Sequence, residues 1–186
     1  MKISKTSQIL TALFSLACAI AAGYLILRGS GMFPEPSISL ILLTAIFIIL
    51  LSSSRKSFYL ILLPLVCLHA FYTPTGLNFG APSYQYIASV LATDMLETKE
   101  FLLQIPVSSY LAALAIPVLV FLHYKSAVKF GVKFYRNKTF IALATLLIGY
   151  NLPIAAPLKE TIDSTAKIVD EWQKLKKMSQ ESNWGQ

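Results

Sequence analysis

Charged residues are scarce in this chain. Only 13% of its 186 residues are charged, 55% are apolar, and the mean hydropathy is +0.62. Soluble domains carry about a quarter charged residues, so this composition excludes an ordinary soluble globular domain. The sequence predicts an all-α integral membrane protein.

Cysteine and histidine are scarce as well. The two cysteines, Cys18 and Cys67, both lie inside long apolar runs and provide no disulfide framework. The two histidines, His69 and His123, lie near opposite ends of different apolar runs, so we do not expect them to share a metal ion. We therefore assign no metal ligand and no catalytic residue to this chain, and leave the role of His69 open.

Long uncharged runs dominate what is present. A helix needs roughly 20 apolar residues to cross the hydrocarbon of a bilayer. The first run continues past Cys18 to Leu27, which is too long for the apolar core of a signal peptide and favours an uncleaved anchor. The sequence predicts five membrane spans within a membrane domain 1–158, at about 9–27, 36–54, 57–73, 105–124 and 139–157.

The charges between these runs predict an orientation. With the N-terminus in the cytoplasm, the inner segments hold nine basic residues and no acid, whereas the outer segments hold seven basic residues and all nine acids. The positive-inside rule favours this arrangement, with the C-terminus outside. The high pI of about 9.4 then reflects inner loops that face membrane lipids, and no nucleic-acid partner is expected.

The outer segment after the third span predicts an amphipathic periplasmic helix at about 83–102, with Ser83 as its cap. Its polar side carries residues spaced four, four and three apart: Ser89, Thr93, Glu97 and Glu100. One interpretation is a solvated face that keeps an interfacial helix from sinking. The other is a polar stripe at headgroup depth, where Glu97 is the partner of the ammonium of a zwitterionic lipid and Thr93 forms a neutral hydrogen bond.

The outer segment after the fifth span, 159–186, predicts a second amphipathic periplasmic helix. Apolar residues recur in it every three or four positions. Its polar end, "SQESNWGQ", is typical of a linker, so we expect a further domain to follow.

The stretch "LATDMLETKEFL", Leu91–Leu102, resembles the L-x-T-[DN]-x-x-E-[ST]-x-[DE]-x-L stretch of the phosphoethanolamine transferases of Gram-negative inner membranes. This family includes the lipid A modifying enzymes, the mobile colistin-resistance enzymes and the enzymes that act on periplasmic glucans. The preceding "FGAPSYQ" and the five-span plan with an outer helical tail are also similar. The resemblance covers nearly the whole chain.

The resemblance implies that catalysis and donor-lipid binding involve two different domains. In the family, a periplasmic alkaline-phosphatase-like domain with zinc and a threonine nucleophile takes phosphoethanolamine from phosphatidylethanolamine. The membrane part supplies an Asn, a Thr and a Glu to the donor-lipid pocket. By motif position the Thr and Glu fall on Thr93 and Glu97, and the Asn position is Ser89 here, a departure from the pattern.

The family's G-E-[ST] nucleophile motif is absent from this sequence. The resemblance therefore implies a membrane-anchoring domain that presents the donor lipid to a separate catalytic domain. The two domains together would modify the cell envelope, and this chain alone would be inactive. Three alternatives stay open: a stand-alone lipid-binding or regulatory inner-membrane protein, an inactive truncated remnant, and a small transporter. The last fits poorly because the spans hold almost no ionisable residues.

Overall fold

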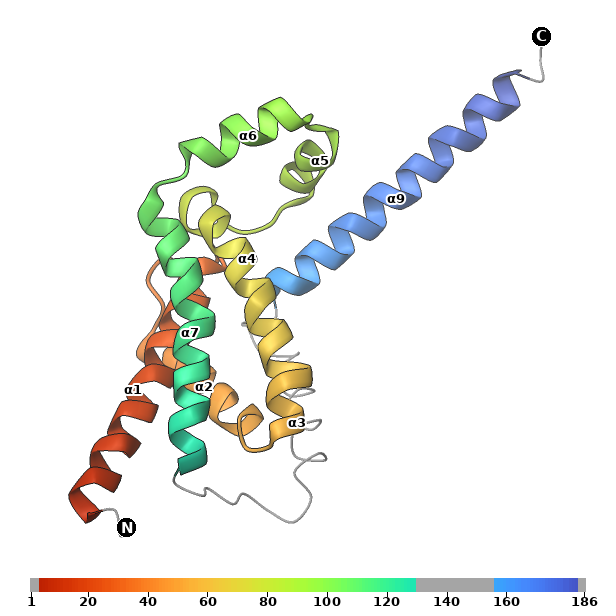
Figure 1. The fold of residues 1–186 in the computed structure, drawn as a ribbon. Helices are drawn as coiled ribbons and strands as arrows, with labels where there is room; N and C mark the ends of the chain where they lie inside the picture. The colour runs from red at the N-terminus through yellow and green to blue at the C-terminus, as the bar shows by residue number, and fades with distance from the viewer. Residues whose placement is uncertain (1–3, 130–155, 184–186) are drawn as a thin grey trace. The chain divides into compact units, whose positions relative to one another are not determined.

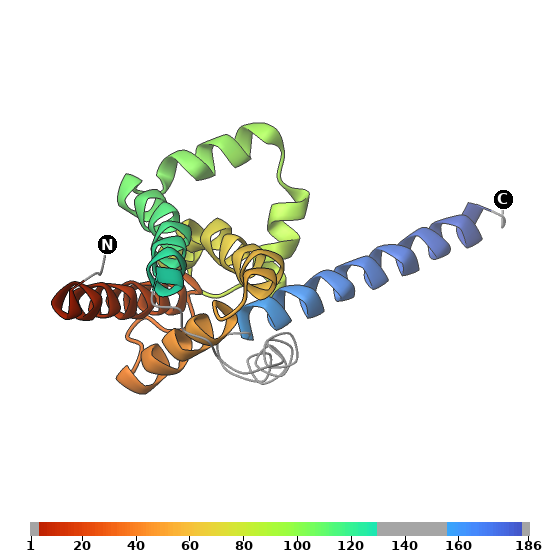
Figure 2. The same cartoon turned by 60° about the horizontal axis from the view of Figure 1, so that its bottom comes forward.

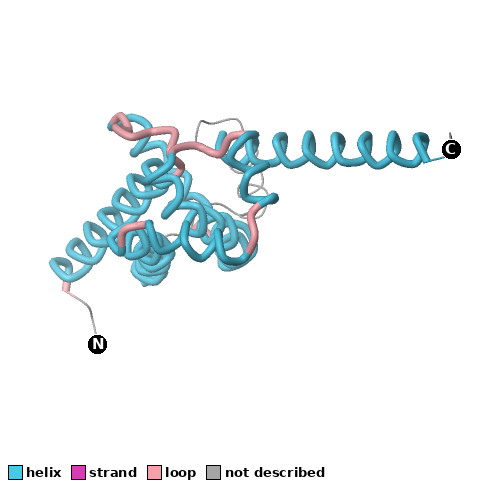
Figure 3. Tube along the Cα trace, turned by 90° about the horizontal axis from the view of Figure 1, so that it is seen from above, coloured by secondary structure: helices cyan, strands magenta, loops and turns pink. Residues whose placement is uncertain are grey.

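The structure, a computed structural model, describes residues 4–129 and 156–183. In these residues it contains helices and loops and no strand (Figure 3). The all-helical prediction is therefore confirmed for the described part of the chain. The helices are α1 (Lys5–Gly29), α2 (Ile38–Leu51), α3 (Arg55–Ser57), the π-helical turn η1 (Phe58–Leu62), α4 (Leu63–Phe79), α5 (Tyr84–Ala92), α6 (Met95–Gln104), α7 (Val107–Lys129) and α9 (Ala156–Asn183).

Three helices are long and apolar enough to cross a membrane: α1, the continuous helix Arg55–Phe79, and Val107–Val128 within α7. The second predicted span, 36–54, contains only the 14-residue apolar helix α2. At 1.5 Å per residue α2 is about 21 Å long, which is short of the hydrocarbon thickness of roughly 30 Å. The fifth predicted span, 139–157, lies outside the described residues, so the five-span arrangement stays a prediction.

Helix α7 has an exposed apolar side and a buried apolar side. The buried side is formed by Ile116, Val120 and Tyr124. The exposed side carries four apolar residues spaced four, three and four apart: Val107, Leu111, Leu114 and Val118. A continuous apolar stripe without protein cover suits a helix that faces lipid, which supports the identification of a membrane protein.

The chain forms two compact units, and the first comprises residues up to Ala81 together with 105–155. In its described part, α1, α4 and α7 pack pairwise and α2 packs beside α1 (Figures 1 and 2). The π-helical turn places Phe58 in the core, where its ring stacks on that of Tyr124 at 3.9 Å between centroids and 7° between planes. Such turns insert one extra residue into a helix and re-aim its side chains.

A polar contact joins α1 to α7 inside this core. His123 is 3% exposed, and its Nδ1 lies 2.9 Å from both the hydroxyl and the carbonyl oxygen of Ser15. The Ser15 hydroxyl also donates to the carbonyl of His123, at 3.2 Å. These hydrogen bonds between Ser15 and His123 fix the register of α1 against α7. Among the described residues, no group of three or more His, Cys, Asp or Glu side chains could hold a metal ion.

Two glycines let α1 and α4 approach backbone to backbone. A Cβ added to Gly76 would lie 1.9 Å from the carbonyl oxygen of Gly29. A Cβ added to Gly29 would lie 2.4 Å from the Thr73 hydroxyl. No side chain fits at this crossing, so its geometry depends on both glycines.

Hydrogen bonds also tie the end of α4 to the start of α7. The side-chain amide of Asn78 donates to the carbonyl of Pro74 at 2.7 Å and to the hydroxyl of Ser109 at 2.9 Å. The Tyr72 hydroxyl donates to the carbonyl of Gly80 at 2.6 Å. The chain passes into the second unit after Ala81 and returns from it at Ile105, so these two connections follow helix ends that are joined by hydrogen bonds.

The second unit comprises 82–104 and Ala156 onward, and it corrects one prediction. The sequence predicts a single helix over about 83–102, but α5 ends at Ala92 and α6 begins at Met95. Thr93 has extended backbone, with φ −77° and ψ 139°. The single-helix prediction is wrong because Asp94 caps a new helix at this point.

Helix α9 also corrects the predicted linker. Its 28 residues run without interruption to Asn183, so Ser179–Asn183 is helical. The structure has a helix where the tail helix was predicted, and its periplasmic location stays a prediction. Residues 184–186 lie outside the described residues.

Candidate functional site

The break between α5 and α6 is built by local capping. The Asp94 carboxylate accepts a hydrogen bond from the backbone N–H of Glu97 at 2.9 Å, which satisfies a donor that a helix start leaves unpaired. The Thr98 hydroxyl donates to the carbonyl of Asp94 at 2.8 Å. Asp94 therefore starts α6 and places Glu97 in its first turn.

The three predicted lipid contacts lie on both sides of this break. The Thr93 hydroxyl donates to the carbonyl of Ser89, and the Ser89 hydroxyl donates to the carbonyl of Gln85 at 2.9 Å. Thr93 is thus brought onto the end of α5 beside Ser89. Glu97 belongs to α6, and the continuous polar stripe expected from the sequence is divided between two helices.

Glu97 is exposed in the first turn of α6, where the positive end of the helix dipole favours an acidic side chain. Glu100 is exposed one turn later on the same side. The rest of α6 presents exposed apolar side chains, with Met95 88% and Leu103 75% exposed. Acidic and apolar surface side by side on one short helix suits the boundary between lipid headgroups and acyl chains.

Helix α6 is also tethered close to a predicted span. Only Ile105 and Pro106 separate Gln104 from Val107, the first residue of α7. The three Cα-to-Cα steps from Gln104 to Val107 span at most about 11 Å. Covalent connectivity therefore keeps the end of α6 near the start of α7.

A contact that the sequence does not predict joins α5 to α9. The Tyr84 hydroxyl donates to the Glu171 carboxylate, and the Lys167 ammonium lies 4.9 Å from the centre of the Tyr84 ring. The two helices pack against each other along this contact. We call these three residues the α5–α9 clasp. The hydrogen bond to Glu171, followed by desolvation and the nearby negative charge, raises the pKa of Tyr84 above the usual phenol value.

The clasp gives a testable pH dependence. Because the pKa of Tyr84 is raised in the folded state, the bond is fully present below the ordinary phenol pKa of about 10 and is lost as pH rises through the raised value. Glu171→Gln is expected to lower the pKa of Tyr84, which tyrosinate difference absorbance against a Tyr84→Phe reference measures. Asp170→Asn is the matched control, because Asp170 pairs with Lys174 at 2.8 Å. An equal shift in both variants would contradict a specific bond.

Comparison with known proteins identifies a relative. The chain is 76% identical over 181 residues to a protein of Haemophilus influenzae described as "Putative phosphoethanolamine transferase". The match covers 97% of this chain and 37% of that protein. No protein-family model and no solved structure matches the chain. This match confirms the resemblance to the phosphoethanolamine transferases: the chain is similar along almost its whole length to a protein with that description, and it spans about 37% of that protein's length.

Proposed function

We propose that this chain anchors a phosphoethanolamine transferase in the bacterial inner membrane and presents its donor lipid, phosphatidylethanolamine. The observation that carries the proposal is the 76% identity along almost the whole chain to a protein of that description. The proposed acceptors are lipid A or envelope glycans. The zinc-dependent transfer is assigned to a periplasmic catalytic domain, which this chain would serve as partner.

The proposed lipid site is the break between α5 and α6. Glu97 offers an exposed carboxylate for an ethanolammonium group, which carries three N–H donors. Thr93 and Ser89 keep acceptor lone pairs free while their hydroxyl protons bond to backbone carbonyls. The exposed apolar residues of α6 would lie against the acyl chains of the same lipid.

The orientation belongs to the same proposal. With the N-terminus in the cytoplasm, the end of α4 and the start of α7 face the periplasm, and both lead into the second unit. The α5–α6 break then meets lipid headgroups of the periplasmic leaflet.

Headgroup preference tests the proposed function. The chain is reconstituted in nanodiscs holding equal amounts of phosphatidylethanolamine, phosphatidylcholine and phosphatidylglycerol, and lipids that remain bound after extraction are counted by native mass spectrometry. We expect phosphatidylethanolamine to be retained several-fold over phosphatidylcholine, because choline has no N–H donor for Glu97. Retention in proportion to the supplied lipids would overturn the donor-presenting role.

A further inference from the structure

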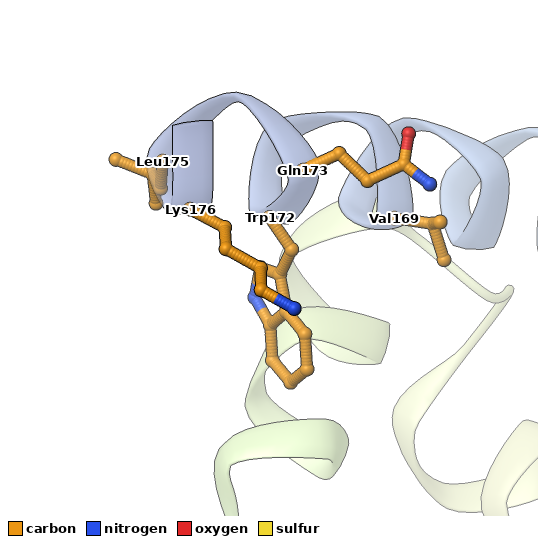
Figure 4. Close-up of a pocket in the computed structure, with 5 residues that line it drawn as sticks. All are labelled: Val169, Trp172, Gln173, Leu175 and Lys176. Atoms are coloured by element: carbon orange, nitrogen blue, oxygen red, sulfur yellow. The ribbon is translucent and has the colours of Figure 1, made fainter. Parts of the chain in front are cut away.

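One side of α9 is apolar and uncovered. Trp172 is 64% exposed and Leu175 60%. Together with Val169, Gln173 and Lys176 these side chains line an open hollow of about 360 Å³ (Figure 4). We call this set of five residues the α9 apolar face. Large exposed apolar side chains gathered on one helix face mark an interaction surface.

The opposite side of α9 already has its partner. Glu171 and Lys167 both contact Tyr84 at the start of α5. The salt bridge between Lys174 and Asp170, at 2.8 Å, also lies on the charged side of the helix. The clasp therefore fixes which side of α9 faces α5 and leaves the apolar face open.

Covalent connectivity limits how far this face can lie from the membrane. Helix α4 forms the second part of the long apolar helix Arg55–Phe79, and only four residues separate Phe79 from Tyr84. The five Cα-to-Cα steps from Phe79 to Tyr84 span at most about 18 Å. The Tyr84 hydroxyl is hydrogen-bonded to the carboxylate of Glu171, and Trp172 is the next residue in the sequence. A typical bilayer has interfacial regions several ångströms deep on each side of its hydrocarbon, so Trp172 lies within reach of them.

The side chains of the α9 apolar face indicate which kind of partner it contacts. Tryptophan is enriched at membrane interfaces because its indole is apolar and carries one N–H donor. A lysine can cover apolar surface with its stem while its ammonium reaches phosphate, and Lys176 lines the same hollow as Trp172. We propose that the α9 apolar face docks into the phospholipid headgroup region, with Val169, Trp172 and Leu175 toward the acyl chains and Lys176 on lipid phosphate. This inference concerns α9 and does not depend on a donor-lipid site at Glu97.

Fluorescence quenching tests this docking. The second tryptophan is removed by Trp184→Phe, and the chain is placed in nanodiscs with and without phosphatidylcholine brominated near the top of its acyl chains. Because a docked face sinks about 5–10 Å into the headgroup and acyl boundary, Trp172 is expected to lose about half of its emission to the bromolipid. The matched control moves the tryptophan to the charged side, in the variant Trp172→Phe, Lys177→Trp, Trp184→Phe, which is expected to show little quenching.

Three outcomes would overturn the docking. Trp172 emission that is red-shifted and unquenched would mean that the face is solvated. Blue-shifted but unquenched emission would mean that protein, such as a second copy of the chain, covers it. Equal quenching at positions 172 and 177 would mean that the helix is immersed without a preferred face.

Discussion

Gly76→Ala is expected to destabilise the membrane unit strongly, although the same change stabilises most helices. In a helix interior, alanine is normally favoured over glycine by about 1 kcal/mol. At Gly76 the new Cβ would lie 1.9 Å from the carbonyl oxygen of Gly29 and 2.8 Å from its carbonyl carbon. These are backbone atoms of α1, so the clash is relieved only when the two helices separate. We expect a net loss of about 1–3 kcal/mol, which is the usual range for overpacking.

Gly23→Ala is the matched comparison, because it makes the same change in a helix of the same unit. Its nearest neighbours would be the Ile41 carbonyl oxygen at 3.2 Å and the Thr44 Cβ at 3.3 Å, which need to yield by only a few tenths of an ångström. Thermal unfolding in one detergent measures both variants, and Gly76→Ala is expected to unfold at a clearly lower temperature. Equal midpoints would contradict a close backbone crossing at Gly29 and Gly76.

The sequence predicted the long helices of this fold well, and it predicted their irregularities poorly. Uncharged apolar runs set the positions of α1, α4 and α7, because a run of about 20 such residues has few alternatives to a membrane-crossing helix. The π-helical turn that begins at Phe58 has no such signature in the sequence, and neither has the stacking of the Phe58 ring on Tyr124 of another helix. Tertiary packing decides such local changes of helix geometry.

The break inside the predicted helix 83–102 did have a sequence signal. Asp94 is followed three residues later by Glu97, which is the spacing of a helix-starting capping box. The apolar periodicity of this segment suggested that one helix runs through it, but the cap at Asp94 starts a second helix. As a result, Glu97 was correctly placed on a helix, but its predicted alignment with Ser89 and Thr93 on one helical face was wrong.

Contacts between distant residues were out of reach of the sequence. The clasp joins Tyr84 to Glu171, and the core contact joins Ser15 to His123, which lie 87 and 108 residues apart. Neither pair belongs to a recurring motif. Both become visible only when packing brings the helices together, so the sequence analysis predicted the helix at 159–186 without its contact to α5.

Glu97→Gln is expected to have the largest effect on the proposed lipid site. The change keeps the size of the side chain and removes its charge, so an ethanolammonium group would lose a charge-assisted hydrogen bond. Such bonds contribute about 1.5–3 kcal/mol, which corresponds to a loss in affinity of roughly tenfold to a hundredfold. Titration of fluorescent phosphatidylethanolamine into nanodiscs that hold the chain measures this loss.

Glu100→Gln makes the test specific, because Glu100 lies exposed on the same side of α6 one turn further from its start. If the carboxylates act only as a general negative surface, both variants weaken binding to a similar extent and raised salt removes the difference from the unaltered chain. If Glu97 holds the headgroup, Glu100→Gln changes the affinity by no more than about fivefold, since an exposed charge pair contributes at most about 1 kcal/mol. Affinity for phosphatidylcholine distinguishes the two cases again. A choline headgroup has no N–H donor, so if Glu97 acts through a hydrogen bond, phosphatidylcholine is expected to bind the Glu97→Gln variant as tightly as the unaltered chain. If the carboxylates act as a general negative surface, phosphatidylcholine is expected to bind both variants more weakly than the unaltered chain.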